Sequence, residues 1–288
     1  MKSLAGINAG PSRVEYSHED SRLYALTIGM GADPLFEPEL DFVTDRPGFK
    51  AVPTMACIFA DVIMELTLAC KLDRPELALH GQQKLELLKP LPGAARLEVT
   101  GSIPALYDRG PNRGAEIHMQ AEARIAGETD PLYRATYITI ARGDGGFGGQ
   151  PPPVRAARQQ IPDRAPDRTC SYLTRPNQAL LYSLNGDPNP IHVQPRIARM
   201  AGFETPILHG LCTYGMACRA LLATCADYDS DVIRTFDARF TAPVTPGDEL
   251  VFEFWQEQSA VIFQVMSKLL GRPVIKDGWC ELGAGQSL

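Results

Sequence analysis

The chain has 288 residues, of which 44% are hydrophobic and 22% are charged, and these proportions are ordinary for a globular protein. This length can hold one large domain or two domains of ordinary size, with ample volume for a core. The formal net charge of −6 argues against a general nucleic-acid binder, because phosphate binding requires a basic face.

The sequence indicates neither a secretory signal nor a membrane span. The first thirty residues lack the apolar stretch of a signal peptide, and the longest apolar run, Met55 to Cys70, is interrupted by Asp61 and Glu65. The seven cysteines contain no C-x-x-C pair, which is typical of reduced thiols. The C-terminal Gln-Ser-Leu lacks the basic residue of a peroxisomal address. We therefore expect a cytoplasmic protein without a membrane partner, and a peroxisomal location is less favoured.

The first half, residues 1–142, is expected to combine one long helix with a run of strands. Apolar residues at helical spacing predict a helix from Thr54 to Ala69, with Pro53-Thr54 as its start signal. The strands that follow are expected at about 78–88, 94–107, 114–126 and 132–142.

Residues 143–169 differ in composition and divide the chain. Three consecutive prolines, Pro151 to Pro153, favour an extended segment without a core of its own. The preceding Gly143-Asp-Gly-Gly-Phe-Gly148 satisfies the G-x-G-x-x-G pattern of dinucleotide-binding sites. That site needs a helix directly after the last glycine, and the prolines exclude one. We therefore interpret the segment as a connector.

The second half, residues 170–288, repeats the order of the first. A long apolar helix is expected from Gly210 to Ala226, after short helices at about 177–183 and from about Pro195. Strand candidates lie near 232–242, 249–258, 260–270 and 273–283, with a turn at 246–248. A long helix followed by antiparallel strands suggests a sheet wrapped around a buried helix, and this order occurs twice.

Only the second half carries the segment Gly186-Asp-Pro-Asn-Pro-Ile-His192. It places an acid (Asp187), an amide (Asn189) and an imidazole (His192) within six residues, on a backbone that two prolines restrict. A carboxylate and an imidazole can hold one water between them and exchange protons with it. The alternative is a turn in which Asp and Asn cap the backbone beside a packed histidine. The first interpretation predicts one active site per chain.

Together with Leu208-His-Gly-Leu-Cys-Thr213, this segment resembles the signature of the hydratase 2 family, the MaoC-like (R)-specific enoyl-CoA hydratases of the hot-dog fold. Three further stretches look like eukaryotic-type members, such as the hydratase unit of peroxisomal multifunctional enzyme type 2: residues 24–31, 79–92 and 145–149. In those members two hot-dog units are fused in one chain. The resemblance implies an α+β double hot-dog, with two antiparallel sheets each wrapped around a long central helix.

The resemblance also implies an activity, the reversible hydration of trans-2-enoyl-CoA to (3R)-3-hydroxyacyl-CoA by a hydro-lyase. It places the catalytic dyad on Asp187 and His192, and Asn189 would orient the water or the dyad. Gly210 is the candidate oxyanion donor, because the first N–H groups of a helix lack intrahelical partners. The alternative is that Gly210 only relieves crowding. No metal or other cofactor is expected, since coenzyme A arrives as part of the substrate.

Substrate contacts are implied in both halves. The residues are His80, Gly81 and Arg109 in the first half and Pro188, Pro190 and Phe240 in the second. The guanidinium of Arg109 suits the phosphates of coenzyme A, although Asp108-Arg-Gly110 is equally typical of a turn. Phe240 is equally well explained as a core aromatic. The acyl tail needs an apolar pocket, for which residues 30–55 are the candidate; alternatively they form a surface loop packed on itself.

Several alternatives stay open. His209 is expected to cap the second long helix rather than to contact substrate. A metal site built from Asp187, His192, His209 and Cys212 would match no usual zinc spacing. A hot-dog acyl-CoA thioesterase shares the fold and the ligand. A non-catalytic acyl-CoA-binding module is a third possibility, although it has no use for an acid–base pair. A homodimer is possible, because hot-dog sheets often pair edge to edge, although in a fused chain the two halves are expected to satisfy that pairing internally.

Overall fold

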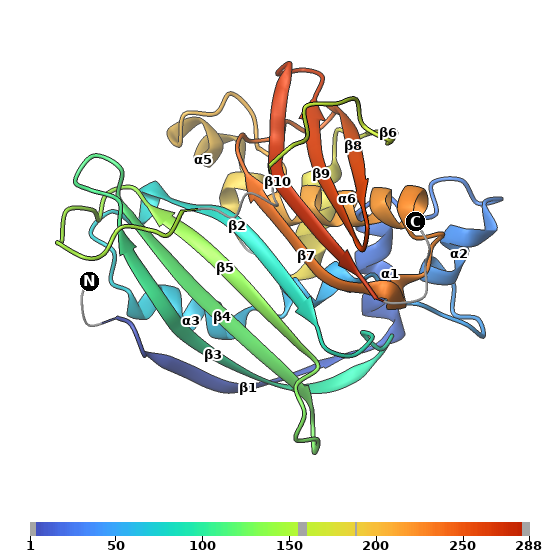
Figure 1. The fold of residues 1–288 in the computed structure, drawn as a ribbon, viewed down its shortest axis with the longest axis horizontal. Coiled ribbons are helices and arrows are strands. Elements are labelled where there is room, and N and C mark those ends of the chain that lie inside the picture. The colour runs from blue at the N-terminus through green and yellow to red at the C-terminus, as the bar shows by residue number, and fades with distance from the viewer. Residues whose placement is uncertain (1–3, 155–159, 188, 284–288) are drawn as a thin grey trace.

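The computed structural model describes residues 4–154, 160–187 and 189–283. Its strands form one antiparallel sheet of ten strands in the order β1-β3-β4-β5-β2-β7-β10-β9-β8-β6. The sheet curls around helices that include α3 and α6 (Figure 1). The strands are β1 (Asn8–Tyr16), β2 (Ala78–Leu87), β3 (Ala95–Asp108), β4 (Ala115–Ile125), β5 (Tyr133–Ala141), β6 (Arg168–Leu173), β7 (Ile233–Phe240), β8 (Glu249–Glu257), β9 (Ala260–Ser267) and β10 (Arg272–Leu282).

The helices precede the strands of each half or connect them. The α-helices are α1 (His18–Thr27), α2 (Glu37–Val43), α3 (Asp61–Ala69), α4 (Gln178–Tyr182), α5 (Pro195–Met200) and α6 (Gly210–Cys225). The 3-10 turns are η1 (Pro53–Ile58), η2 (Pro75–Leu77), η4 (Ser183–Asn185), η5 (Pro190–His192) and η6 (Ser230–Val232). Among the described residues, no helix combines the length and the apolar character that a membrane crossing needs.

The structure has the double hot-dog arrangement, with one correction: the two expected sheets are a single sheet. β2 of the first half pairs with β7 of the second, from Gln82 opposite Arg239 to Glu86 opposite Thr235. The edge strand of a sheet exposes unpaired backbone N–H and C=O groups, and here the edges of the two halves satisfy each other. The junction also brings the first residues of β2 beside the last residues of β7.

Each strand expected from the sequence is present, with ends within a few residues of the expected positions. In β4 every second residue from Ala115 to Ala123 is buried, and this alternation made the strand predictable. β1 and β6 were not expected. Both are edge strands, and their patterns of exposed and half-buried residues give a weak periodic signal. β6 begins at Arg168, inside the segment that the sequence assigns to the connector.

The long central helix expected from Thr54 to Ala69 is wrong for the first half. The chain forms η1, leaves the helical region at Phe59, and begins α3 at Asp61. The Tyr137 hydroxyl donates to the carbonyl of Cys57 at 2.6 Å, and in a continuous helix that carbonyl would accept from the N–H of Asp61. A tertiary contact therefore interrupts the helix, and α6 is the single long central helix of the described residues.

α6 is buried along nearly its whole length, and two elements of the first half are held against it. Gly215 permits the approach of α1, because a Cβ there would lie 2.7 Å from the Tyr24 hydroxyl and from the Ile28 side chain. Arg219 makes a buried ion pair with Glu39 of α2, with nitrogen-to-oxygen distances of 2.7 and 3.1 Å. The two halves thus share one core, and α6 lies at its centre.

The glycine-rich stretch after β5 forms a loop around Asp108. That carboxylate accepts the backbone N–H groups of Gly110, Gly146 and Gly148 at 2.7 to 2.8 Å. These bonds, the one from Gly146 above all, hold the pKa of Asp108 below its usual range. No helix follows in the described residues up to 154, so the geometry of a dinucleotide-binding turn is not formed.

Candidate active site

The segment after α4 turns sharply before Asp187. η4 ends at Asn185, and Gly186 has φ 92°, a left-handed conformation that glycine adopts without strain. The Asp187 carboxylate accepts the backbone N–H of Asn189 at 2.9 Å, and the Asn189 side chain accepts the N–H of Ile191 at 3.2 Å. The capping expected of a simple turn is therefore present, and it holds Asp187 in place. Pro188 lies outside the described residues.

His192 ends η5, and its ring is oriented by a single hydrogen bond. Its Nδ1 lies 2.9 Å from the carbonyl oxygen of Ile207. Because a carbonyl only accepts, Nδ1 carries the proton and Nε2 of the neutral ring keeps a free lone pair. Burial lowers the pKa of His192, while the Ile207 carbonyl and Asp187 act in the opposite direction. The ring can therefore act as a base at neutral pH.

His209, which precedes α6, completes a cluster with these two residues. Asp187, His192 and His209 each offer an oxygen or nitrogen within 4.8 Å of the others. The two imidazoles stack with centroids 3.8 Å apart, and Nε2 of His209 lies 3.9 Å from a carboxylate oxygen of Asp187. The spacing of Asp187 and His192 in the sequence indicated these two residues as candidates. Nothing in the sequence indicated that the His209 ring stacks against His192.

The role expected for His209 is wrong, because its side chain makes no capping hydrogen bond to α6. The side chain is buried, and neither ring nitrogen finds a hydrogen-bond partner among the described residues. Burial, and then the neighbouring His192, lower the pKa of His209 to about 3. His209 is therefore a neutral ring that is stacked against the ring of His192.

The same cluster is poorly shaped for a metal ion. The planes of the His192 and His209 rings meet at only 29° while the centroids are 3.8 Å apart. A histidine binds a metal that lies in its ring plane about 2 Å from the nitrogen. Two rings stacked in this way cannot both direct a lone pair at one such point.

Gly210 is the first residue of α6, and its N–H belongs to the unpaired first turn of that helix. A Cβ at Gly210 would lie 3.4 Å from the ring of Phe240, so the glycine faces the end of β7. The Phe240 ring in turn packs edge-on against His80 of β2, with centroids 5.0 Å apart. Residues of both halves therefore meet beside the N-terminus of α6.

His80 and Gly81 lie where β2 is irregular, since the pairing of β2 with β5 shifts register between His80 and Gln82. Burial lowers the pKa of His80 to about 4, and its Nε2 has no hydrogen-bond partner among the described residues. A Cβ at Gly81 would lie 2.7 Å from the Ile140 side chain. Gly81 thus allows close packing of the two strands, and His80 faces Phe240.

Arg109 lies apart from this group, in the turn between β3 and β4. Its N–H donates to the carbonyl of Gly114, and its own carbonyl accepts from the Arg113 side chain, each at 3.0 Å. Ala115 is paired with Ala141, and Ala141 with Ala78, so this turn lies at the same end of the sheet as His80. The structure places Arg109 at the end of the sheet where His80 lies, and none of its contacts among the described residues is with the cluster.

Sequence reasoning missed Tyr182, the last residue of α4. Its ring lies 5.0 Å from that of His209, its side chain is buried, and its hydroxyl has no hydrogen-bond partner among the described residues. The residue opens the segment that ends at His192, but nothing in the local pattern showed which way it points.

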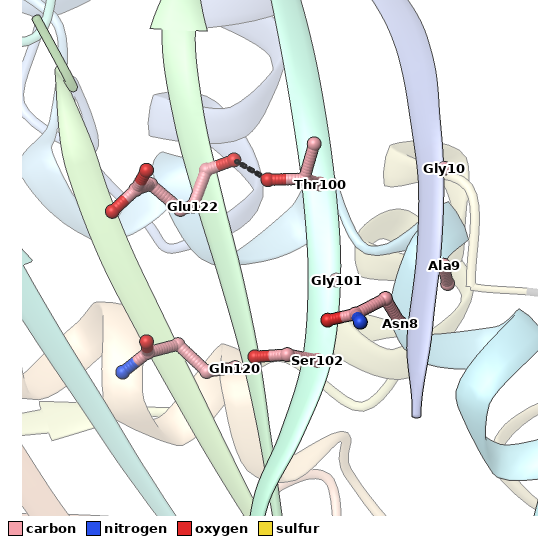
Figure 2. A pocket seen from close by; sticks show the side chains of 8 residues that line it. All are labelled: Asn8, Ala9, Gly10, Thr100, Gly101, Ser102, Gln120 and Glu122. Atoms are coloured by element: carbon pink, nitrogen blue, oxygen red, sulfur yellow. Dashed lines mark hydrogen bonds between the residues drawn. The ribbon is translucent and has the colours of Figure 1, made fainter. Parts of the chain in front are cut away.

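A hollow on the outer face of the sheet is unrelated to the cluster. Figure 2 shows that its wall comes from β1, β3 and β4, and sheet order separates these strands from β7. Beside the backbone pairing of these strands, the Thr100 hydroxyl donates to the Glu122 carbonyl at 3.5 Å. The lining contains no histidine or cysteine, and we assign it no chemistry. The residues are Asn8, Ala9, Gly10, Thr100, Gly101, Ser102, Gln120 and Glu122.

Comparison with known proteins matches each half of the chain to a hydratase-related family model. Residues 14–143 match the family model of the MFE-2 hydratase 2 N-terminal domain, and residues 157–277 match that of the MaoC like domain. The enoyl-CoA hydratase 2, peroxisomal, of Arabidopsis thaliana is 36% identical, over 92% of this chain and 89% of the relative. The 3-hydroxyacyl-thioester dehydratase Y of Mycobacterium tuberculosis is 36% identical, over 96% of each.

Solved structures agree with the sequence matches. A MaoC-like dehydratase from Phytophthora capsici superposes with a TM-score of 0.84 at 28% identity, covering 98% of this chain and 97% of that one. The full-length peroxisomal multifunctional enzyme type 2 of Drosophila melanogaster gives 0.80 at 32% identity, over 96% of this chain and 48% of that one. The matches in sequence and in fold therefore agree, and this chain belongs to the MaoC-like hydratase 2 family of hydro-lyases, in its two-unit form.

Proposed function

We propose that this protein reversibly hydrates trans-2-enoyl-CoA to (3R)-3-hydroxyacyl-CoA. The observation that supports this most directly is the arrangement of Asp187 and His192. Their polar atoms lie within 4.8 Å, and Nε2 of His192 is the ring nitrogen left free by the Ile207 carbonyl. Relatives of similar length include the enoyl-CoA hydratase 2 proteins of Arabidopsis thaliana and Dictyostelium discoideum.

The mechanism uses the pair to hold and split one water. Asp187 and Nε2 of His192 bind the water, and one of them removes its proton while the oxygen attacks the β-carbon of the thioester. A proton is delivered to the α-carbon, so the product gains one hydroxyl and one hydrogen and the pair returns to its starting state. Asn189 holds Asp187 through its backbone N–H, at 2.9 Å from the carboxylate.

Negative charge builds on the thioester oxygen as the β-carbon is attacked. The N–H of Gly210 suits this charge, because it begins a helix of sixteen residues whose dipole is positive at that end. A preorganised donor of this kind can be worth about 3–4 kcal/mol in the transition state. A Cβ at Gly210 would lie 3.4 Å from the Phe240 ring, so Phe240 borders the approach to this N–H.

The rest of the substrate would extend over both halves. The enoyl group would lie against His80 and Phe240, and Pro190 begins the turn that carries His192. Arg109, at the same end of the sheet, is the candidate for the phosphates of coenzyme A. The acyl tail is assigned to the region of residues 30–55, which contains α2.

No metal or other cofactor is part of this proposal, since coenzyme A enters with the substrate. The partner is an acyl-CoA thioester, without a role for nucleic acid or a membrane. A homodimer stays a prediction, because β2 and β7 already pair within the chain. A cytoplasmic location also stays a prediction, and the Arabidopsis relative is named peroxisomal.

The test of the dyad is kinetic. We expect Asp187→Asn and His192→Gln each to lower kcat for a short and a medium-chain trans-2-enoyl-CoA by at least roughly 100-fold, since each removes an acid–base group. Loss of enoyl-thioester absorbance measures the rate. Unchanged turnover in either variant would contradict the assigned roles.

Two matched variants control for structural damage. Asp229 caps a turn through the N–H of Asp231 at 3.0 Å, as Asp187 does through Asn189, so Asp229→Asn tests the loss of the negative charge at such a cap, while the amide oxygen can still accept the N–H. His118 on β4 pairs with Glu116 at 2.9 Å, and His118→Gln tests the loss of a partly buried imidazole. Both are expected to keep wild-type turnover.

A further inference from the structure

Thr27, the last residue of α1, is the point where the first half contacts the catalytic segment. Its hydroxyl accepts a hydrogen bond from the side-chain amide of Asn185 at 2.7 Å. Its carbonyl accepts from the Gln178 side chain of α4 and, at 3.8 Å, from the Cys212 thiol of α6. Thr27 is 3% exposed. One buried residue of the first half therefore accepts hydrogen bonds from three side chains of the second half.

The hydrogen bonds around Thr27 have a defined direction. The Thr27 hydroxyl donates its proton to the carbonyl of Tyr24 at 2.8 Å, which leaves an oxygen lone pair for Asn185. The Asn185 amide donates its other proton to the carbonyl of Tyr182 at 3.0 Å. Both protons of this amide are thus bound, and the side chain is held between α1 and α4.

Asn185 is the last such anchor before the catalytic acid. Only Gly186 separates it from Asp187, and the Gly186 N–H closes η4 by donating to the Ser183 carbonyl at 3.1 Å. On the other side, the Asp187 carboxylate is bound by the N–H of Asn189. The position of Asp187 relative to His192 therefore depends on where Asn185 is held.

The same residue is tied to the oxyanion donor. Cys212, which contacts the Thr27 carbonyl, lies in the first turn of α6, as Gly210 does. α1 is also packed on α6 at Gly215, through Tyr24 and Ile28. A shift of Thr27 would move Asp187 and Gly210 relative to each other, and a reaction that needs both would slow.

We propose that Thr27 is a positioning residue for the hydration, because its hydroxyl holds Asn185 and thereby sets the place of Asp187. This inference rests on the proposed function, in which Asp187 and His192 activate the water. It gives the first half a role in catalysis, although that half lacks the motif.

The test compares Thr27→Val with Thr27→Ser. Valine matches threonine in shape but lacks the hydroxyl, while the backbone contacts to Gln178 and Cys212 remain. We expect Thr27→Val to lower kcat by roughly 10- to 100-fold, as small misplacements of reacting groups do. KM should stay within about twofold, since substrate binding is unchanged. Thr27→Ser restores the hydroxyl and should restore kcat.

A control and a second variant complete the experiment. Thr224→Val removes a hydroxyl that also donates to a helix carbonyl, that of Ala220 at 2.8 Å, and should leave kcat unchanged. If Thr27 acts through Asn185, the double variant Thr27→Val with Asn185→Ala should be no slower than Asn185→Ala alone. Should Thr27→Val not fold, Asn185→Ala decides, because Asn185 is only half-buried.

Two results would overturn the inference. One is a wild-type kcat in Thr27→Val or in Asn185→Ala. The other is a double variant whose loss of kcat equals the product of the losses in the two single variants. Failure of the proposed function gives a different result, because the wild-type protein would then not hydrate trans-2-enoyl-CoA, or Asp187→Asn would keep its turnover whatever happens at Thr27.

Discussion

His192 has the protonation state of a possible base because of two neighbours that are not adjacent to it in sequence. The Ile207 carbonyl accepts from Nδ1 at 2.9 Å and so leaves Nε2 unprotonated, and the stacked His209 ring shields one face. Neither contact is visible in the spacing of Asp187, Asn189 and His192. At the scale of single residues, the sequence proposed candidate reacting groups, and the fold supplies the tautomer and the protonation state of His192.

This arrangement predicts the pH dependence of hydration. Burial moves the pKa of His192 below its ordinary value of 6.5, and protonation would remove the lone pair that binds water. We therefore expect kcat/KM to fall as the pH decreases, with the midpoint of the acid limb below pH 6.5. His118→Gln should give the same profile, since that ring pairs with Glu116. A midpoint at or above 6.5 would show that His192 is not the controlling group.

At the scale of elements, the strands were more predictable than the helices. The alternating burial of β4 follows from one sheet face packing on helices, and such a pattern is local. The break between η1 and α3 depends on the Tyr137 hydroxyl, which reaches Cys57 from β5. No local signal could show this, because the donor is 80 residues further along the chain.

The attachment of α2 to α6 predicts a difference in stability. Glu39→Gln would leave the Arg219 charge buried without its partner, and we expect this to lower the free energy of unfolding by about 3–5 kcal/mol. Glu249→Gln removes a more exposed pair, with Lys268 at 2.7 Å, and should leave the urea midpoint close to wild type. Equal effects of the two substitutions would contradict the role given to the buried pair.

At the scale of the whole molecule, the two halves are joined through one sheet. The repeated order of helix and strands predicted the double hot-dog, and the usual edge-to-edge pairing of hot-dog sheets predicted that the halves pair with each other. The sequence did not show that β2 and β7 are the strands that pair, because their contacts are far apart in the chain. The candidate site shows the same limit. Asp187 and His192 lie in one motif, whereas Asn185 is bound by Thr27, 158 residues away.

Sequence reasoning therefore assigned the chemistry to the second half, where the motif is. The structure adds that His80 of β2, Phe240 of β7 and Thr27 of α1 surround or support that motif. Fusion of two units then has a physical consequence: the half without the motif forms part of the site. Local patterns could not predict this, because each such contact joins residues that are distant in sequence.

The hydratase activity is tested by incubating trans-2-enoyl-CoA with the wild-type protein and identifying the product. If the protein is an (R)-specific hydratase, enoyl-thioester absorbance falls without release of free thiol, and an (S)-specific 3-hydroxyacyl-CoA dehydrogenase does not oxidise the product. Release of free thiol would instead show a thioesterase. Tight binding without turnover at any chain length would show a binding module, and either result would contradict the hydratase assignment.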